Sequence, residues 1–377
     1  MGNGTDPRTQ LSGSSSCAYL AFEVASGSAH KVQILETCDA LTSFGVDTEL
    51  LMYPDGAETP SASELRQLYE LGNTPRISWI PRDGSKWVAR LRLVVESSRA
   101  GHRCAYIYTR RAVAALGALL GGARHVFLEI HQSTPIGYDR VALRLVGHSK
   151  RLHIVCVSRR LAEIIARRYG LEESALIVEH NGASFPILDD YSVDSGASRR
   201  LRAMYVGTFA AGRGLGTIFD LAALHPTVDF VVVGGQAPAG RLPDNVAVRG
   251  PVPHAAVPEL LSQADILLMP YTRTVMLSDG VTDTAEYCSP LKMIEYLSAG
   301  RSIIASNLPS IAEILVHESN CLLVDPESVE EWSAAMGRLE RDPRLRVLLA
   351  HGAAETAGRH TILGRVQRIL EHAGAAE

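Results

Sequence analysis

A serine, a proline and a lysine stand close together in the segment CSPLKMIEYLSAGRSIIAS, residues 288–306. Ser289 is a good helix N-cap, and Pro290 suits the first helical position because proline has a fixed φ and no amide hydrogen. Gly300 suits the C-terminal stop of the same helix. The sequence therefore predicts a helix that starts at Ser289 and ends before Gly300.

Lys292 falls in the first turn of this predicted helix. A cation is normally unfavourable there, because the helix dipole already makes that end positive. A bound anion such as a diphosphate removes the conflict, and the free backbone groups near Leu291 would help to hold it. Glu295 lies six residues after Ser289, or about 9 Å along the axis, where its carboxylate can accept hydrogen bonds from ribose hydroxyls. The alternative is an ordinary amphipathic helix whose buried stripe is Leu291, Ile294 and Leu297.

A second candidate segment is MYVGTFAAGRGLGTIFDLA, residues 204–222. Its glycines permit tight turns and a close approach of the backbone to a ligand. Arg213 can make a forked contact with a diphosphate. The glycine spacing does not match GxGxxG, so a flexible loop is the alternative, and a nicotinamide oxidoreductase is disfavoured.

Short β-branched apolar runs alternate with helix-length amphipathic segments along the whole chain, which predicts parallel sheets built from βαβ units. In the first half we expect strands near Ala18–Val24, Thr48–Met52, Arg76–Ile80, Ala105–Tyr108, Val126–Ile130, Ile154–Val157 and Leu176–Glu179. In the second half we expect them near Ala203–Val206, Phe230–Val233, Val246–Val248, Ile266–Met269, Ile303–Ala305 and Leu322–Val324. The fold class is α/β, with two doubly wound Rossmann-like sheets.

Residues 184–200 interrupt this pattern with Pro, Asp, Ser and Gly, and they mark the expected domain boundary. We expect a flexible tail at 1–16, an acceptor-binding domain at 17–190 and a nucleotide-sugar-binding domain at 200–345. Terminal helices at 346–377 are expected to cross back to the first domain.

The stretch SPLKMIEYLSAGRSIIASNLPSIAEIL resembles the donor-binding segment of glycosyltransferase family 4, whose members are retaining enzymes with the GT-B fold. The resemblance implies that Glu295 is the second of the family's two donor-binding glutamates. Eight positions earlier, where the family commonly has the first, this chain has Tyr287 with Glu286 beside it. The glycine-rich segment resembles the first turn of the family's nucleotide domain, with Arg213 in place of the usual lysine.

The same resemblance assigns further residues around a central cleft. It implies that the backbone at Pro251 and Val252 binds the nucleobase, with a plain strand-to-helix turn as the alternative. It also implies that the turn at Gly27 and Ser28 meets the diphosphate, with a turn that binds no ligand as the alternative. His131, at the end of a first-half strand, would border the donor sugar, although a lone histidine is often structural. His131, Arg213 and Lys292 form the expected catalytic set. The expected donor-binding residues also include Ser289, Pro290, Leu291 and Glu295. Candidate acceptor or sugar contacts are Glu23, His30 and Glu129, with pairing to a neighbouring helix as the alternative for Glu129. The long acidic-polar loop at residues 273–287 adds Asp279, Asp283 and Glu286 as candidates, with a solvated loop as the alternative.

Composition, charge and the spacing of apolar residues argue against several other classes of protein. Apolar residues make up 46% of the 377 residues and charged residues 21%, which is typical of a folded protein. The net charge of -4 gives no indication of a nucleic-acid partner. The six cysteines are scattered, which predicts reduced thiols in a cytoplasmic protein. No apolar run is long enough to span a membrane, and no strong basic-apolar membrane face is evident.

The sequence contains no DxD pair that could hold a metal bridging the diphosphate. Arg213, Lys292 and helix N-termini are therefore expected to neutralise the leaving group. No cofactor is expected beyond the nucleotide-sugar co-substrate. The resemblance implies a retaining transfer of a hexose-type sugar from a nucleoside-diphosphate sugar, UDP more than GDP, to a small hydroxylated acceptor. An aminocyclitol of an antibiotic pathway is the expected acceptor. A cell-envelope or lipid-linked-sugar enzyme and a non-catalytic nucleotide-sugar-binding module are the alternatives; nothing indicates the oligomeric state.

Overall fold

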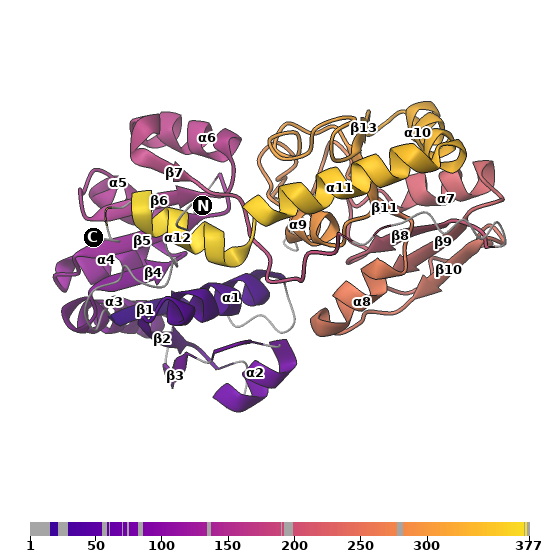
Figure 1. Ribbon diagram of the computed structural model, residues 1–377. Coiled ribbons are helices and arrows are strands. Elements are labelled where there is room, and N and C mark those ends of the chain that lie inside the picture. Colours follow the sequence, from indigo (N-terminus) through magenta and orange to yellow (C-terminus); the bar gives the residue numbers. More distant parts are fainter. Residues whose placement is uncertain are drawn as a thin grey trace, which may run out of the picture. The chain divides into compact units, whose positions relative to one another are not determined.

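The computed structural model describes residues 16–21, 29–54, 59, 61–69, 71–73, 75–81, 86–133, 137–189, 191, 199–276, 282–372 and 374. The chain divides into two compact units (Figure 1). The first comprises Met1–Gly182 with Ile362–Glu377, and the second comprises Ala183–Thr361.

The first unit holds a parallel sheet in the order β3-β2-β1-β4-β5-β6-β7. Its strands are β1 (Ser16–Ala21), β2 (Asp47–Met52), β3 (Arg76–Trp79), β4 (Tyr106–Thr109), β5 (His125–Ile130), β6 (Leu152–Cys156) and β7 (Leu176–Val178). Its helices are α1 (Ala29–Ser43), α2 (Ala62–Tyr69), α3 (Lys86–Arg103), α4 (Ala112–Leu120), α5 (Gly137–Val146), α6 (Arg159–Tyr169) and the C-terminal α12 (Ile362–His372).

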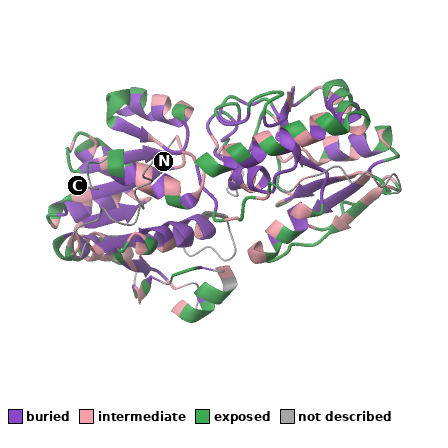
Figure 2. Cartoon of the chain, viewed as in Figure 1, coloured by how far each residue is buried: buried purple, intermediate pink, exposed green. Residues whose placement is uncertain are grey.

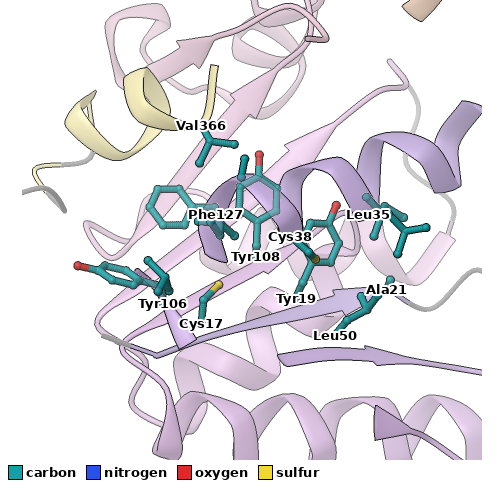
Figure 3. Close-up of a cluster of buried hydrophobic side chains, with 14 of the residues drawn as sticks. Cys17, Tyr19, Ala21, Leu35, Cys38, Leu50, Tyr106, Tyr108, Phe127 and Val366 are labelled. Atoms are coloured by element: carbon teal, nitrogen blue, oxygen red, sulfur yellow. The ribbon is translucent and has the colours of Figure 1, made fainter. Parts of the chain in front are cut away.

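Aromatic side chains fill one face of this first sheet (Figure 3). Tyr108 on β4 stacks on Tyr19 of β1 at 5.1 Å between ring centres and on Phe127 of β5 at 5.7 Å. Val366 of α12 belongs to the same buried cluster, so the C-terminal helix completes the core of the first unit.

The second unit holds a parallel sheet in the order β10-β9-β8-β11-β12-β13. Its strands are β8 (Arg202–Val206), β9 (Asp229–Val233), β10 (Val246–Arg249), β11 (Ile266–Met269), β12 (Ser302–Ser306) and β13 (Leu322–Val324). Its helices are α7 (Leu215–Leu224), α8 (Val257–Ser262), α9 (Leu291–Ser298), α10 (Val329–Arg341) and α11 (Pro343–Arg359). Buried residues fill most of β8, β9, β11 and β12, whereas the edge strand β10 has none (Figure 2).

The expected strands are all present, and two doubly wound parallel sheets confirm the predicted fold class. The second unit extends to Thr361 instead of residue 345, because α11 packs on α9 and β12 of that unit. Within residues 346–377, α12 is the helix that belongs to the first unit.

The order of the strands reverses at one point in the second sheet. From β8 the chain builds outward through β9 and β10, then crosses to β11 on the other side of β8. At such a switch point the loops leaving the two central strands diverge and leave room for a ligand at the carboxyl edge of the sheet. A ligand site is therefore expected at the loops after Val206 and Met269.

Candidate functional site

Lys292 lies in the first turn of α9, beside the ends of β8 and β11. Its ammonium nitrogen lies 3.6 Å from the centre of the Tyr205 ring and 5.6 Å from that of Tyr271. Burial and the nearby Arg213 hold the pKa of Lys292 well below its ordinary value, although Glu295 opposes them. A cation here is short of negative charge and readily stabilised by an anion.

Arg213 reaches the same place from the loop between β8 and α7. Its guanidinium carbon lies 4.8 Å from the centre of the Tyr271 ring, so two cations share one aromatic side chain. Burial raises the pKa of Tyr271 to about 12, and Arg213 limits that rise. Among the residues that the structure describes, no carboxylate forms a salt bridge with Arg213 or Lys292. Two like charges without a counter-ion are stabilised when an anion lies beside them.

The backbone at the end of β8 fits this arrangement. Gly207 has φ of +151°, and a Cβ there would overlap the ammonium group of Lys292. Gly214 is the N-cap of α7 with φ of +67°, and a Cβ there would overlap the carbonyl oxygen of Pro270. Glycine is thus required for the close approach of this loop to the segments that follow β11 and begin α9.

The N-cap and the first helical residue of α9 each lie one residue later than predicted. Pro290 is the N-cap, with φ and ψ of -68° and 129°, and the helix begins at Leu291. Pro290, predicted as the first helical residue, is instead extended and caps the helix without a side-chain hydrogen bond. The predicted stop is correct in position, because Gly300 follows the helix with φ of +55°. Lys292 remains in the first turn.

Glu295 lies one turn beyond Lys292 on α9. Its Oε1 lies 2.8 Å from Nε2 of His254, and its carboxylate is mostly buried. His254 in turn contacts the ring of Phe185. The predicted ribose-binding carboxylate is thus held by a histidine through one oxygen, while its other oxygen forms no hydrogen bond within the described chain.

The predicted base-binding backbone at Pro251 and Val252 lies directly after β10 and is exposed. His254 follows it after two residues, in a 3-10 turn of residues 254–256. The pair of His254 and Glu295 therefore connects the predicted base-binding and ribose-binding positions.

The predicted sugar contacts after β11 have different surroundings. Asp283 is exposed, but its Oδ1 accepts hydrogen bonds from the amides of Val275 and Ala285 and so shapes its own loop. Glu286 is exposed, whereas the neighbouring Tyr287 is 3% exposed. Of these two, Glu286 is thus the one with an exposed side chain. Asp279 lies outside the described residues.

Glu129 in the first unit is a buried structural anion, so the interpretation as an acceptor contact is corrected. It accepts hydrogen bonds from Tyr108 at 2.6 Å, Arg110 at 2.7 Å and Arg365 at 2.9 Å. Burial would raise the pKa of Glu129, but Arg365 and Arg110 hold it well below its ordinary value. Arg365 belongs to α12, which matches the alternative of pairing with a neighbouring helix.

His131 follows β5 and keeps a quarter of its side chain exposed. Its Nε2 bonds to Glu129, so an ionised Glu129 receives the imidazole hydrogen and Nδ1 is left as an acceptor. Burial lowers the pKa of His131 to about 4, with Arg110 in the same direction and Glu129 against it. The imidazole is therefore neutral near pH 7. Glu23, Gly27 and Ser28 lie outside the described residues, as does the side chain of His30.

Sequence reasoning missed Tyr205, Tyr271 and His254 as parts of the site. The two tyrosines lie in and just after buried strands, where an aromatic residue normally signals core. The available signal for His254 was its position at a helix start after a strand, in the same kind of junction as Lys292.

Among the described residues, no three or more His, Cys, Asp or Glu side chains are grouped in a way that could hold a metal ion. None of the helices described here has the length and apolar character needed to cross a bilayer.

Residues 202–342 match the family model described as glycosyl transferases group 1. A search of curated protein sequences finds no match to this chain. Among solved structures, HepE of Anabaena in complex with UDP is 16% identical with a TM-score of 0.72, covering 94% of this chain and 98% of that one.

Two further solved structures are similar over nearly the whole chain. Sucrose-phosphate synthase from Thermosynechococcus elongatus is 16% identical with a TM-score of 0.68, covering 96% of this chain and 100% of that one. TarM is 7% identical with a TM-score of 0.73, covering 98% and 100%. These likenesses establish the GT-B fold, and the residues that match the family model all lie in the second unit.

Proposed function

We propose that this protein is a glycosyltransferase that takes a sugar from a nucleoside-diphosphate donor. The observation that carries the proposal is the pair of cations, Arg213 and Lys292, that share the Tyr271 ring at the switch point of the second sheet. A diphosphate supplies the negative charge that both lack. The match of residues 202–342 to glycosyl transferases group 1 supports a sugar nucleotide as the molecule that carries it.

The second unit offers a position for each part of such a donor. The diphosphate would lie between Arg213 and Lys292, near the first turn of α9 and the backbone of Ser289, Pro290 and Leu291. The free oxygen of Glu295 would accept hydrogen bonds from ribose, and the exposed backbone at Pro251 and Val252 would line the base. UDP is the preferred nucleotide, supported by the similarity to HepE, which was solved with UDP.

The chemistry follows from where charge develops. As the bond from the sugar carbon to the diphosphate oxygen breaks, the leaving group gains negative charge, which Arg213 and Lys292 stabilise without a metal ion. A diphosphate oxygen would take the proton of the acceptor hydroxyl as that hydroxyl attacks from the same face. The anomeric configuration of a hexose-type sugar is then retained. His131 is the proposed sugar contact from the first unit, and it would act as a neutral imidazole.

We propose that the acceptor is a small hydroxylated molecule such as an aminocyclitol. A cell-envelope or lipid-linked acceptor is the second candidate, and one observation favours it: the helix α5 carries arginines beside exposed valine and leucine side chains. A non-catalytic nucleotide-sugar-binding module would bind the donor through the same residues without turnover.

The test is calorimetry with UDP and GDP, followed by donor turnover with UDP- and GDP-sugars in the presence and absence of EDTA. We expect UDP to bind more tightly, turnover to survive EDTA and the product's NMR spectrum to show the donor's anomeric configuration. An absence of nucleotide affinity would refute the proposal. An inverted linkage would refute retention, loss of turnover with EDTA would refute metal independence, and binding without turnover would favour the non-catalytic module.

A further inference from the structure

The helix α5 in the first unit presents an unusual outward face. Its inward positions are Asp139, Ala142, Leu143 and Val146, all buried. Its outward positions form two pairs spaced four residues apart, so each pair lies along one side of the helix. One pair is Arg140 and Arg144; the other is Val141, 58% exposed, and Leu145, 69% exposed.

Arg168 and Tyr169 of the helix α6 extend this face. With Arg140 and Arg144 they line a cavity of about 300 Å³. The hydroxyl of Tyr169 is buried and forms no hydrogen bond within the described chain. The cavity thus combines three guanidinium groups with a hydroxyl that has no partner.

The acidic residues of α5 and α6 bond to other partners, while Arg168 donates a hydrogen bond to the backbone carbonyl of Ser133. The acidic residue of α5, Asp139, is buried and bonded to Arg111 and to the amide of Val113. The acidic residue of α6, Glu163, pairs with Arg160. Arg140 and Arg144 form no salt bridge with any residue that the structure describes.

We propose that α5 and α6 form a docking surface for an anionic membrane, with a lipid phosphate held among Arg140, Arg144 and Arg168 and with Val141 and Leu145 inserted beside it. Arginine binds phosphate through paired hydrogen bonds, and the hydroxyl of Tyr169 supplies another donor. An amphipathic helix with arginines next to apolar side chains lies in the plane of the lipid headgroups. A soluble phosphate compound would occupy the cavity without any need for the exposed valine and leucine.

The experiment is sedimentation of the full chain with vesicles of phosphatidylcholine alone and with vesicles that also contain phosphatidylglycerol. We expect binding to the anionic vesicles, and we expect salt to weaken it. The variant Arg140→Gln/Arg144→Gln should bind about thirty-fold more weakly, since each arginine near an anionic surface contributes about a fivefold factor. Val141→Ser/Leu145→Ser should also bind more weakly, with less change in salt dependence.

A matched control is available on α11 of the second unit, where Arg344 is exposed and Leu348 is 57% exposed four residues later. Arg344→Gln/Leu348→Ser should bind vesicles as the unchanged protein does, and circular dichroism should show that every variant is folded. The proposal fails if the unchanged protein ignores anionic vesicles, if it binds neutral vesicles equally well, or if the control variant loses as much binding. It also fails if calorimetry shows that inorganic phosphate binds at these arginines while vesicles do not. None of these readouts requires sugar transfer, so they are independent of the proposed function.

Discussion

The ammonium group of Lys292 lies 3.6 Å from the centre of the Tyr205 ring, directly over an aromatic side chain of the central strand β8. A cation above an aromatic face is attracted by the ring's electron density, which offsets part of the cost of removing the charge from water. The pKa of Lys292 is nevertheless held well below its ordinary value, so the ring does not replace a counter-ion.

Replacing Lys292 should damage the transfer step. We expect Lys292→Met to lower kcat/KM for the nucleotide sugar by roughly 10²–10³, which is typical for the loss of one group that stabilises developing negative charge. Steady-state kinetics measures this. The exposed Lys150 gives a matched control, and Lys150→Met should leave the kinetics with a soluble acceptor unchanged. Equal losses in the two variants would contradict the assigned role.

Binding of UDP should be accompanied by proton uptake. The diphosphate raises the pKa of Lys292 from its depressed value toward the ordinary one, so between these two pH values binding adds a proton. The affinity for UDP should consequently fall as pH rises through that window. Calorimetry at a series of pH values from about 8 upward, where the terminal phosphate is already ionised, in buffers of different ionisation enthalpy measures the uptake. Lys292→Met should abolish it, and an unchanged uptake in that variant would rule out this lysine as the source.

The glycine at the end of β8 should be required for both stability and donor binding. Gly207→Ala places a Cβ against the Lys292 ammonium at a φ of +151°, so we expect a loss of about 1–3 kcal/mol in the free energy of unfolding and weaker UDP binding. The control is Gly216→Ala in α7, which has open space around it and should stabilise the protein by about 0.4–1 kcal/mol. Urea unfolding and calorimetry report the two effects. Normal UDP affinity in a folded Gly207→Ala protein would contradict the close approach.

The buried ion pair between Arg365 of the C-terminal helix α12 and Glu129 should contribute strongly to the stability of the first unit. Arg365 and Glu129 are both 0% exposed, and Arg365→Met leaves a buried carboxylate with fewer partners. We expect a loss of about 3–5 kcal/mol in the free energy of unfolding of the first unit. Arg368 on the same helix pairs with Glu179 but is 37% exposed, so Arg368→Gln should cost less than about 1 kcal/mol. Similar losses in urea unfolding would show that burial does not distinguish the two pairs.

The sequence by itself determined the order of strands and helices, because apolar runs bounded by turn residues specify strands covered on both faces. It also identified Lys292, Arg213 and Glu295 as candidates, because a lysine in a first helical turn and glycines after a strand are local signals. The start of α9 was placed one residue too early, because Pro290 is extended and caps the helix instead of beginning it. These properties depend on neighbours in the chain and can be read from it.

The tertiary structure decided which side chains meet. Tyr271 became part of the site because β8 and β11, far apart in the sequence, are adjacent strands, and Glu129 became a buried anion because α12 returns with Arg365. The outward direction of Val141 and Leu145 on α5 likewise depends on which side of the helix the sheet covers. Burial and long-range pairing set the free energy of each charge, and neither is encoded in the spacing of residues along the chain.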